Sequence, residues 1–162
     1  MPAMSAARRR RRLSEMDLRA WTGFLRAHAE VTRALERDLQ RAGLIQLSDY
    51  GVLLELSRGP ADGRRPLELA SLTSLTKSGL TRLVDRLETA GFVERRACAS
   101  DQRGSLIALT PKGRHVFRRA APMHLDGIAE YFKDRLDDHE LAVMAVAFEK
   151  LVGHERRSIA RA

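Results

Sequence analysis

The stretch LASLTSLTKSGLTRLVDRLETAGFVERR, residues 69–96, decides the fold that this sequence predicts. Its spacing of apolar residues predicts one helix from Pro66 to about Thr73 and a second helix over about residues 76–89. Thr76 suits the cap of the second helix, and Gly91 suits its stop. Residues 92–96 are predicted as a short strand, so helix, turn, helix and strand follow one another closely.

The second of these helices has two chemically different faces. On a helical projection, the apolar face consists of Leu80, Leu83, Val84 and Leu87, and the opposite face consists of Lys77, Ser78, Thr81, Arg82 and Asp85. The apolar face is predicted to pack on the domain. Short polar and cationic side chains are typical of a helix that enters the major groove of DNA, although an ordinary exposed helix has the same pattern.

Individual roles follow from positions on this helix. Arg82 is the candidate for a bidentate contact with guanine, whereas Arg86 lies on the flank, toward a phosphate or a partner carboxylate. Gly79 allows close approach to DNA. The hydroxyls of Thr76 and Ser78, together with the first backbone amides, can hold a phosphate.

A hairpin is predicted after this helix, with strands over residues 92–96 and 105–109 and the turn between them. Arg103 is expected at the tip, where it can enter a narrow minor groove, and Asp101 is expected to hold the loop through local hydrogen bonds. Asp85 is expected to pair with a wing or helix arginine and to tune its reach to DNA. The base of the hairpin carries cations suited to phosphates, namely Arg95, Arg96 and Lys112.

The remaining chain is predicted to be mostly helical. Ser14 can cap a long helix over about residues 14–42, and Ser48 can cap a helix that ends near Ser57. Thr110-Pro111 starts a fifth helix, which Pro122 is expected to kink or divide, and a last helix starts near residues 137–138. The end helices are long and amphipathic, which favours pairing with a second copy over packing on each other alone.

Charge is concentrated in two parts of the chain. The formal net charge is +8, and residues 1–12 contribute +5 through five arginines, while residues 95–119 contribute +6. A basic cluster indicates a polyanionic partner, although a solvated basic surface is the plainer alternative. We expect residues 1–13 to be a disordered basic tail that either scans phosphates or is simply solvated.

The quoted stretch, the Asp101-Gln-Arg-Gly104 segment and the Leu109-Thr-Pro-Lys-Gly113 segment together resemble the MarR (multiple antibiotic resistance regulator) family of bacterial transcription factors. The resemblance implies a mainly α fold with a small β-hairpin wing (α+β), that is, a winged helix-turn-helix with N- and C-terminal dimerisation helices. It assigns residues 47–113 to DNA binding and residues 14–46 and 114–162 to dimerisation, within one domain over 14–162. The Thr76–Arg86 helix then matches the recognition helix, Arg103 the wing-tip arginine and Asp101 the wing aspartate.

The function implied is a homodimeric repressor that binds double-stranded, pseudo-palindromic DNA and is released by a small phenolic or acidic effector. Trp21, Phe24, His28 and Tyr50 are candidates for the effector site, although core or dimer contacts are the stronger interpretation of Trp21 and Phe24. Ser48 joins the DNA-binding candidates at the start of its helix. The sequence does not specify the operator, the effector or the regulated genes.

Other functional classes have less support. No glycine-rich strand-to-helix turn is present for a cofactor, so we expect neither an enzyme nor a cofactor, and a non-catalytic winged-helix dimerisation module stays as an alternative. The five histidines are scattered, so no metal site is expected. A single cysteine, Cys98, fits a reducing cytoplasm, and a redox regulator acting through Cys98 is a further alternative. No apolar run reaches the length of a membrane span, so a cytoplasmic bacterial protein is expected.

Overall fold

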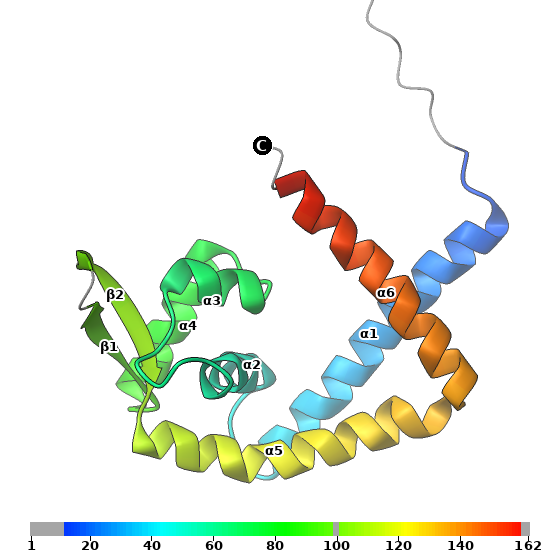
Figure 1. The fold of residues 1–162 in the computed structure, drawn as a ribbon. Coiled ribbons are helices and arrows are strands. Elements are labelled where there is room, and N and C mark those ends of the chain that lie inside the picture. Colours follow the sequence, from blue (N-terminus) through cyan, green and yellow to red (C-terminus); the bar gives the residue numbers. More distant parts are fainter. Residues whose placement is uncertain (1–11, 99–100, 160–162) are drawn as a thin grey trace, which may run out of the picture.

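The computed structural model describes residues 12–98 and 101–159 and has a mainly helical fold with one two-stranded antiparallel sheet (Figure 1). This confirms the predicted fold class. The elements in chain order are α1 (Glu15–Arg41), α2 (Leu47–Ser57), α3 (Pro66–Leu72), α4 (Lys77–Thr89), β1 (Val93–Cys98), β2 (Asp101–Leu109), α5 (Pro111–Tyr131), η1 (Lys133–Arg135) and α6 (Asp138–Ile159). The predicted basic tail lies almost wholly outside the described residues.

Local capping explains where most helices begin. The Ser14 hydroxyl accepts a hydrogen bond from the Asp17 amide, and the Asp17 carboxylate accepts one from the Ser14 amide, which forms a capping box for α1. Thr76 accepts from the Gly79 amide and starts α4. Thr110 caps α5 in the same way, so these three predicted starts are confirmed.

The predicted cap of α2 is wrong. Gln46, not Ser48, occupies the cap position, and its side chain makes no capping hydrogen bond. The carboxylate of Glu36 on α1 instead accepts a hydrogen bond from the Leu47 amide at 2.7 Å. A neighbouring helix therefore satisfies the free amide that a local side chain was expected to satisfy.

The wing formed by β1 and β2 is longer than predicted. The ladder runs from Val93 opposite Leu109 to Ala97 opposite Ser105, and after a register shift Cys98 pairs with Asp101. The segment Asp101–Gly104 was predicted as the turn but belongs to β2. Short ladders tolerate polar residues on an exposed edge, so turn-forming composition alone did not end the strand.

Leucine and valine side chains from the end of α1, from α2, α3, α4 and from the wing form the core over which α5 lies. Its most deeply buried members are Leu39, Val52, Leu53, Leu69, Val84, Leu87 and Val93. The four apolar residues predicted on one face of α4 are all buried here. α4 is thereby fixed through its apolar face, and its opposite face stays toward solvent.

Helix α5 connects the compact part of the fold, formed by α2–α4 and the wing, to the place where α1 and α6 cross (Figure 1). It is one continuous helix, so Pro122 does not divide it as expected. A hydrogen bond of 2.6 Å from the Tyr131 hydroxyl to the Asp38 carboxylate joins α5 to α1. This hydrogen bond raises the pKa of Tyr131 above its ordinary value.

A broad apolar surface remains exposed on α1 and α6. Phe24 of α1 and Phe148 of α6 are in ring contact at 5.9 Å between centroids. Around this contact, the exposed large apolar residues are Met16, Leu18, Trp21, Leu25, Val143, Val146, Leu151 and Val152. Monomeric proteins rarely leave such an extended apolar patch in water.

Candidate nucleic-acid interface

The outer face of α4 is built as the sequence predicted. Lys77, Ser78, Thr81, Arg82 and Asp85 are all exposed, because the leucine face of the helix is turned into the core. The Thr76 cap fixes the first turn and places the following amides at its solvent-exposed end. The helix therefore presents short polar groups and cations on a rigid support.

The cations of this face differ in their partners. Within the part of the chain that the structure describes, no ion pair or hydrogen bond involves the side chains of Lys77 and Arg82, which are available to a ligand. The Arg86 guanidinium, in contrast, forms an ion pair with the Asp49 carboxylate and donates to the Ser48 hydroxyl at 3.4 Å. Of the two predicted outcomes for Arg86, the structure shows the carboxylate partner.

Arg95, at the base of the wing, is held by two carboxylates of α4. Its guanidinium donates to Asp85 at 2.6 Å and also pairs with Glu88, which accepts from the Arg95 backbone amide as well. The hydrogen bond that Arg95 donates to Asp85 and the charge of Glu88 raise the pKa of Arg95. The expected pairing of Asp85 with a wing arginine is confirmed, and it ties α4 to the wing.

Two other predicted phosphate-binding cations also have partners within the protein. Arg96 makes two hydrogen bonds, of 2.8 and 2.6 Å, to the Glu94 carboxylate. The Lys112 ammonium donates to the Ala90 carbonyl at the end of α4 and lies 5.3 Å from the centre of the Phe92 ring. Lys112 therefore stabilises the junction of α4, the wing and α5, whereas the Arg96 pair lies within β1.

The side chains of Asp101, Arg103 and Cys98 lie outside the described residues. The backbone places Asp101 and Arg103 on β2 and Cys98 at the end of β1. Arg103 is therefore a strand residue near the hairpin end, whereas the sequence predicted it in the turn. The wing contact and the redox alternative stay predictions.

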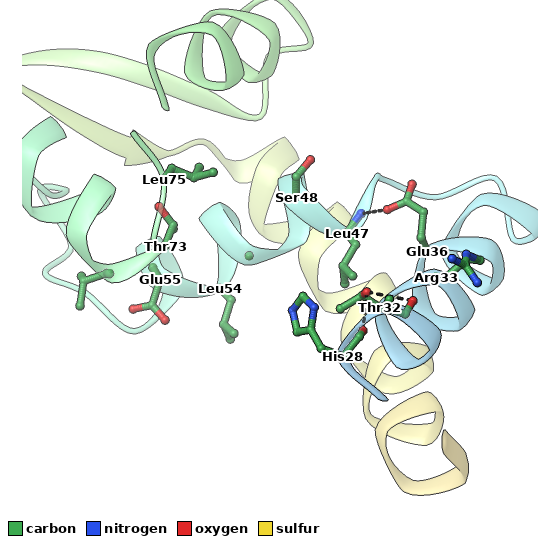
Figure 2. Close-up of a pocket in the computed structure, with 13 residues that line it drawn as sticks. His28, Thr32, Arg33, Glu36, Leu47, Ser48, Leu54, Glu55, Thr73 and Leu75 are labelled. Carbon is green, nitrogen blue, oxygen red and sulfur yellow. Dashed lines mark hydrogen bonds between the residues drawn. The ribbon is translucent and has the colours of Figure 1, made fainter. Parts of the chain in front are cut away.

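An open groove of about 900 Å³ lies between α1, α2 and the end of α3 (Figure 2). His28 projects into the gap from α1, opposite Leu54 of α2. The lining of the groove is mainly apolar, and polar groups lie at both ends. Thr32, Arg33, Glu36 and Ser48 lie at one end, and Glu55 and Thr73 lie at the other.

The four effector candidates do not form one site. Three of them, Trp21, Phe24 and His28, follow one another along α1. The ring centroids of Trp21 and Phe24 are 6.1 Å apart, and those of Phe24 and His28 are 6.4 Å apart. Tyr50 is instead buried between α2 and α5, where it stacks on Phe117 and contacts His124. Of the four candidates, His28 alone lines the groove, and the assignment of these residues to an effector site stays a prediction.

Sequence reasoning missed three acidic residues that organise this region. Asp49 is the buried carboxylate that pairs with Arg86, Glu36 caps α2, and Glu88 shares Arg95 with Asp85. The pairing of Glu88 with Arg95 could have been inferred from the sequence, because the two residues are only seven positions apart. The other two pairs join different helices, so local spacing does not reveal them.

A sequence profile described as the MarR family matches residues 38–104. The crystal structure of AbsC, a MarR family transcriptional regulator from Streptomyces coelicolor, is 34% identical with a TM-score of 0.83, covering 90% of this chain and 98% of AbsC. The chain belongs to the MarR family. The fold of this MarR-family protein therefore matches that of AbsC over nearly its whole described length.

Two further solved structures of relatives contain ligands. Sco3205, a MarR family regulator from S. coelicolor in complex with DNA, is 32% identical with a TM-score of 0.84, covering 90% of this chain and 91% of Sco3205. CouR from Rhodococcus jostii RHA1, bound to p-coumaroyl-CoA, is 29% identical with a TM-score of 0.70, and the match covers 80% of this chain and 90% of CouR.

The curated relatives are matched over part of their length. The match spans 60% of a helix-turn-helix regulator from Bacillus cereus. The transcriptional repressor YetL of Bacillus subtilis is 33% identical over 89 residues, which is 53% of each chain. The MarR-family assignment therefore rests most firmly on the structural relatives. Among its described residues, none of the helices has the length and apolar character of a membrane span, and no group of three or more metal-ligating side chains gathers.

Proposed function

We propose that this protein is a sequence-specific, homodimeric transcriptional repressor that an effector releases from a pseudo-palindromic operator. The observation that carries the proposal is the outer face of α4, where Lys77 and Arg82 are exposed, rigidly supported and without a side-chain partner among the described residues. Polar side chains with free donors are what major-groove readout needs. Sco3205, which is similar over nearly the whole chain, was crystallised with DNA.

Direct contacts are assigned by partner availability. Arg82 is proposed to read a guanine, and Lys77 with Thr76, Ser78 and the first amides of α4 to bind phosphate. Gly79 is proposed to allow the close approach of α4 to DNA, and Thr81 is proposed to line the contact. The DNA-binding candidates already paired within the protein, Ser48, Arg86, Arg95, Arg96 and Lys112, are proposed to position α4 and the wing. The remaining wing residues, Asp101 and Arg103, are proposed to act at the minor groove.

A homodimer follows from the exposed apolar surface of α1 and α6. An amphipathic face that is open in one copy is buried when a two-fold partner presents the same face. Two recognition helices then meet two half-sites of one operator. Residues 14–46 and 114–162 are proposed to supply this interface, and residues 47–113 to bind DNA.

The groove between α1 and α2 is the proposed effector site. It lies between the helices assigned to dimerisation and the helices that carry α4, so a bound molecule contacts both. CouR was crystallised with an aromatic CoA ester, which shows that one relative binds a small molecule. The apolar lining and the His28 ring suit an aromatic effector.

Selection from a random-sequence duplex library tests the DNA proposal without knowledge of the genome. We expect wild-type protein to enrich an inverted repeat. Arg82→Ala should lose about 1–3 kcal/mol of discrimination against a changed base pair in that repeat. Arg41→Ala, which removes an exposed arginine at the end of α1, is the matched control and should keep discrimination intact.

Failure of the wild-type protein to enrich any sequence would contradict the proposal. Equal discrimination by Arg82→Ala and wild type would leave DNA binding in place but remove Arg82 as the base-reading residue. The half-site spacing of the enriched repeat also tests the dimer, because it must match two recognition helices about one helical turn of DNA apart.

A further inference from the structure

The first turn of α2 lies between the groove and the recognition helix. On the groove side, Glu36 of α1 accepts hydrogen bonds from the Leu47 amide at 2.7 Å and from the Gln40 side chain at 2.6 Å. Figure 2 shows the first of these bonds at the edge of the groove, beside Ser48. Because Gln46 provides no side-chain cap, this single carboxylate fixes the start of α2.

On the other side, the same turn is joined to α4. Asp49 is 7% exposed and is the one charged side chain that is buried within the described part of the chain. Its carboxylate pairs with Arg86 of α4, whose guanidinium also reaches the Ser48 hydroxyl. Two successive residues of α2 therefore hold one arginine of the recognition helix.

The burial of Asp49 determines what Arg86 can do. A buried carboxylate that loses its counter-ion is strongly destabilised, whereas an exposed phosphate contact adds only a modest, salt-screened gain. Arg86 is therefore more stable on Asp49 than on a DNA phosphate. Its charge serves the position of α4, not the contact with DNA.

We propose that Asp49 is a positioning residue for DNA recognition, which holds α4 through Arg86, and that Glu36 fixes the same turn of α2. Any molecule in the groove that competes for the Glu36 carboxylate then loosens this turn and shifts α4. The link to DNA rests on the proposed function, whereas the mechanical link between Glu36, Asp49 and α4 does not.

A double-mutant cycle on the selected operator tests the positioning role. Asp49→Leu and Arg86→Met each remove one partner, and each should weaken specific binding about tenfold. The operator affinity of the double variant should be no lower than that of the single variant that binds less tightly, because both substitutions break the same interaction. Binding to unrelated duplex DNA should not change.

The salt dependence of binding separates positioning from phosphate contact. If Arg86 only positions α4, Arg86→Met keeps the wild-type slope of affinity against salt concentration. A slope reduced by about one in Arg86→Met, with additive losses in the double variant, would show a direct phosphate contact and overturn the inference. Thermal unfolding of each variant establishes that it is folded at the assay temperature.

Amide hydrogen exchange tests the mechanical link without any DNA. Glu36→Ala should speed exchange at the start of α2 and in α4, and Asp49→Leu should speed exchange in α4. Glu30→Ala, which removes an exposed acid that precedes Glu36 on α1, is the matched control and should change neither. Unchanged α4 exchange in both test variants would overturn the inference even when operator binding is normal.

The two proposals fail separately. If wild-type protein selects no operator, the proposed function fails, and the exchange experiment still decides whether Asp49 and Glu36 hold α4. If wild-type protein binds its operator but the cycle is additive, only the positioning inference fails.

Discussion

Arg95 shows how an ion pair within the protein makes a basic residue less available to DNA. The basic block around the wing suggests many phosphate contacts, yet Arg95 is held by Asp85 and Glu88. Arg96 is likewise held by Glu94. On the outer face of α4, the cations without a partner among the described residues are therefore Lys77 and Arg82.

Asp85→Asn should strengthen operator binding by about threefold at low salt, because it removes a negative charge beside the DNA and frees part of Arg95. Glu88 still holds Arg95, which limits the gain. The affinity should be measured over a series of salt concentrations, with Glu30→Gln on α1 as the control. An unchanged affinity and an unchanged salt slope would contradict this role of Asp85.

His124 provides a pH-dependent prediction. Burial lowers the pKa of His124 below its ordinary value of 6.5, and its Nδ1 has no hydrogen-bond partner among the described residues. The unfolded chain therefore binds this proton first as the pH falls. Stability should be fully present above pH 6.5 and should decrease as the pH drops through the folded pKa.

Denaturant unfolding of wild type and His124→Phe, above and below pH 6.5, measures this effect. The variant keeps a ring against Tyr50 but cannot titrate, so it should lose less stability on acidification. Equal losses in the two proteins would assign the pH dependence to other groups.

At the scale of elements, the junction of the wing with α5 depends on a missing side chain. A Cβ atom at Gly113 would lie 1.9 Å from the Phe92 carbonyl oxygen, so α5 starts directly against the backbone that enters β1. The Thr110 hydroxyl donates to the Gly91 carbonyl at the same place. The end of α4, the wing and α5 therefore meet at one tightly packed point.

Gly113→Ala should destabilise the protein by about 2 kcal/mol, because α5 and the wing must separate to admit the methyl group. Gly51→Ala is the matched control, since a methyl group there meets nothing within 4 Å. Replacing glycine inside a helix should stabilise the control by about 1 kcal/mol. Urea unfolding compares the two, and equal stabilities would show that the junction yields easily.

Local signals predicted most of the elements and one face of the site. Ser14, Thr76 and Thr110 start helices through hydrogen bonds within three residues, so the sequence alone reveals them. The two faces of α4 follow from helical spacing in the same way. Their contact with DNA is still a prediction.

Interactions between elements were beyond the sequence. Asp49 and Arg86 are 37 residues apart, and Glu36 caps a helix that starts 11 residues later. The stacking of Tyr50 on Phe117 likewise joins α2 to α5, two helices that are far apart in the chain. Local spacing does not determine which helices pack together.

For the whole molecule, the exposed apolar surface makes oligomeric state the decisive property. Val146→Glu combined with Leu151→Glu places two charges on this surface and should give a monomer by sedimentation equilibrium. Operator affinity should fall with it, because one copy reaches one half-site. Leu67→Glu, on α3, is the control and should leave the oligomeric state unchanged. A variant that stays dimeric would move the interface elsewhere.

The chain contains one tryptophan, Trp21, and its indole is 57% exposed on α1 beside Phe24. Trp21 lies on the surface proposed to pair with a second copy, about two helical turns from the groove residue His28. Its emission spectrum therefore reports on the polarity of that surface without any added label. Association, dissociation and effector binding become accessible to stopped-flow fluorescence on the unmodified protein.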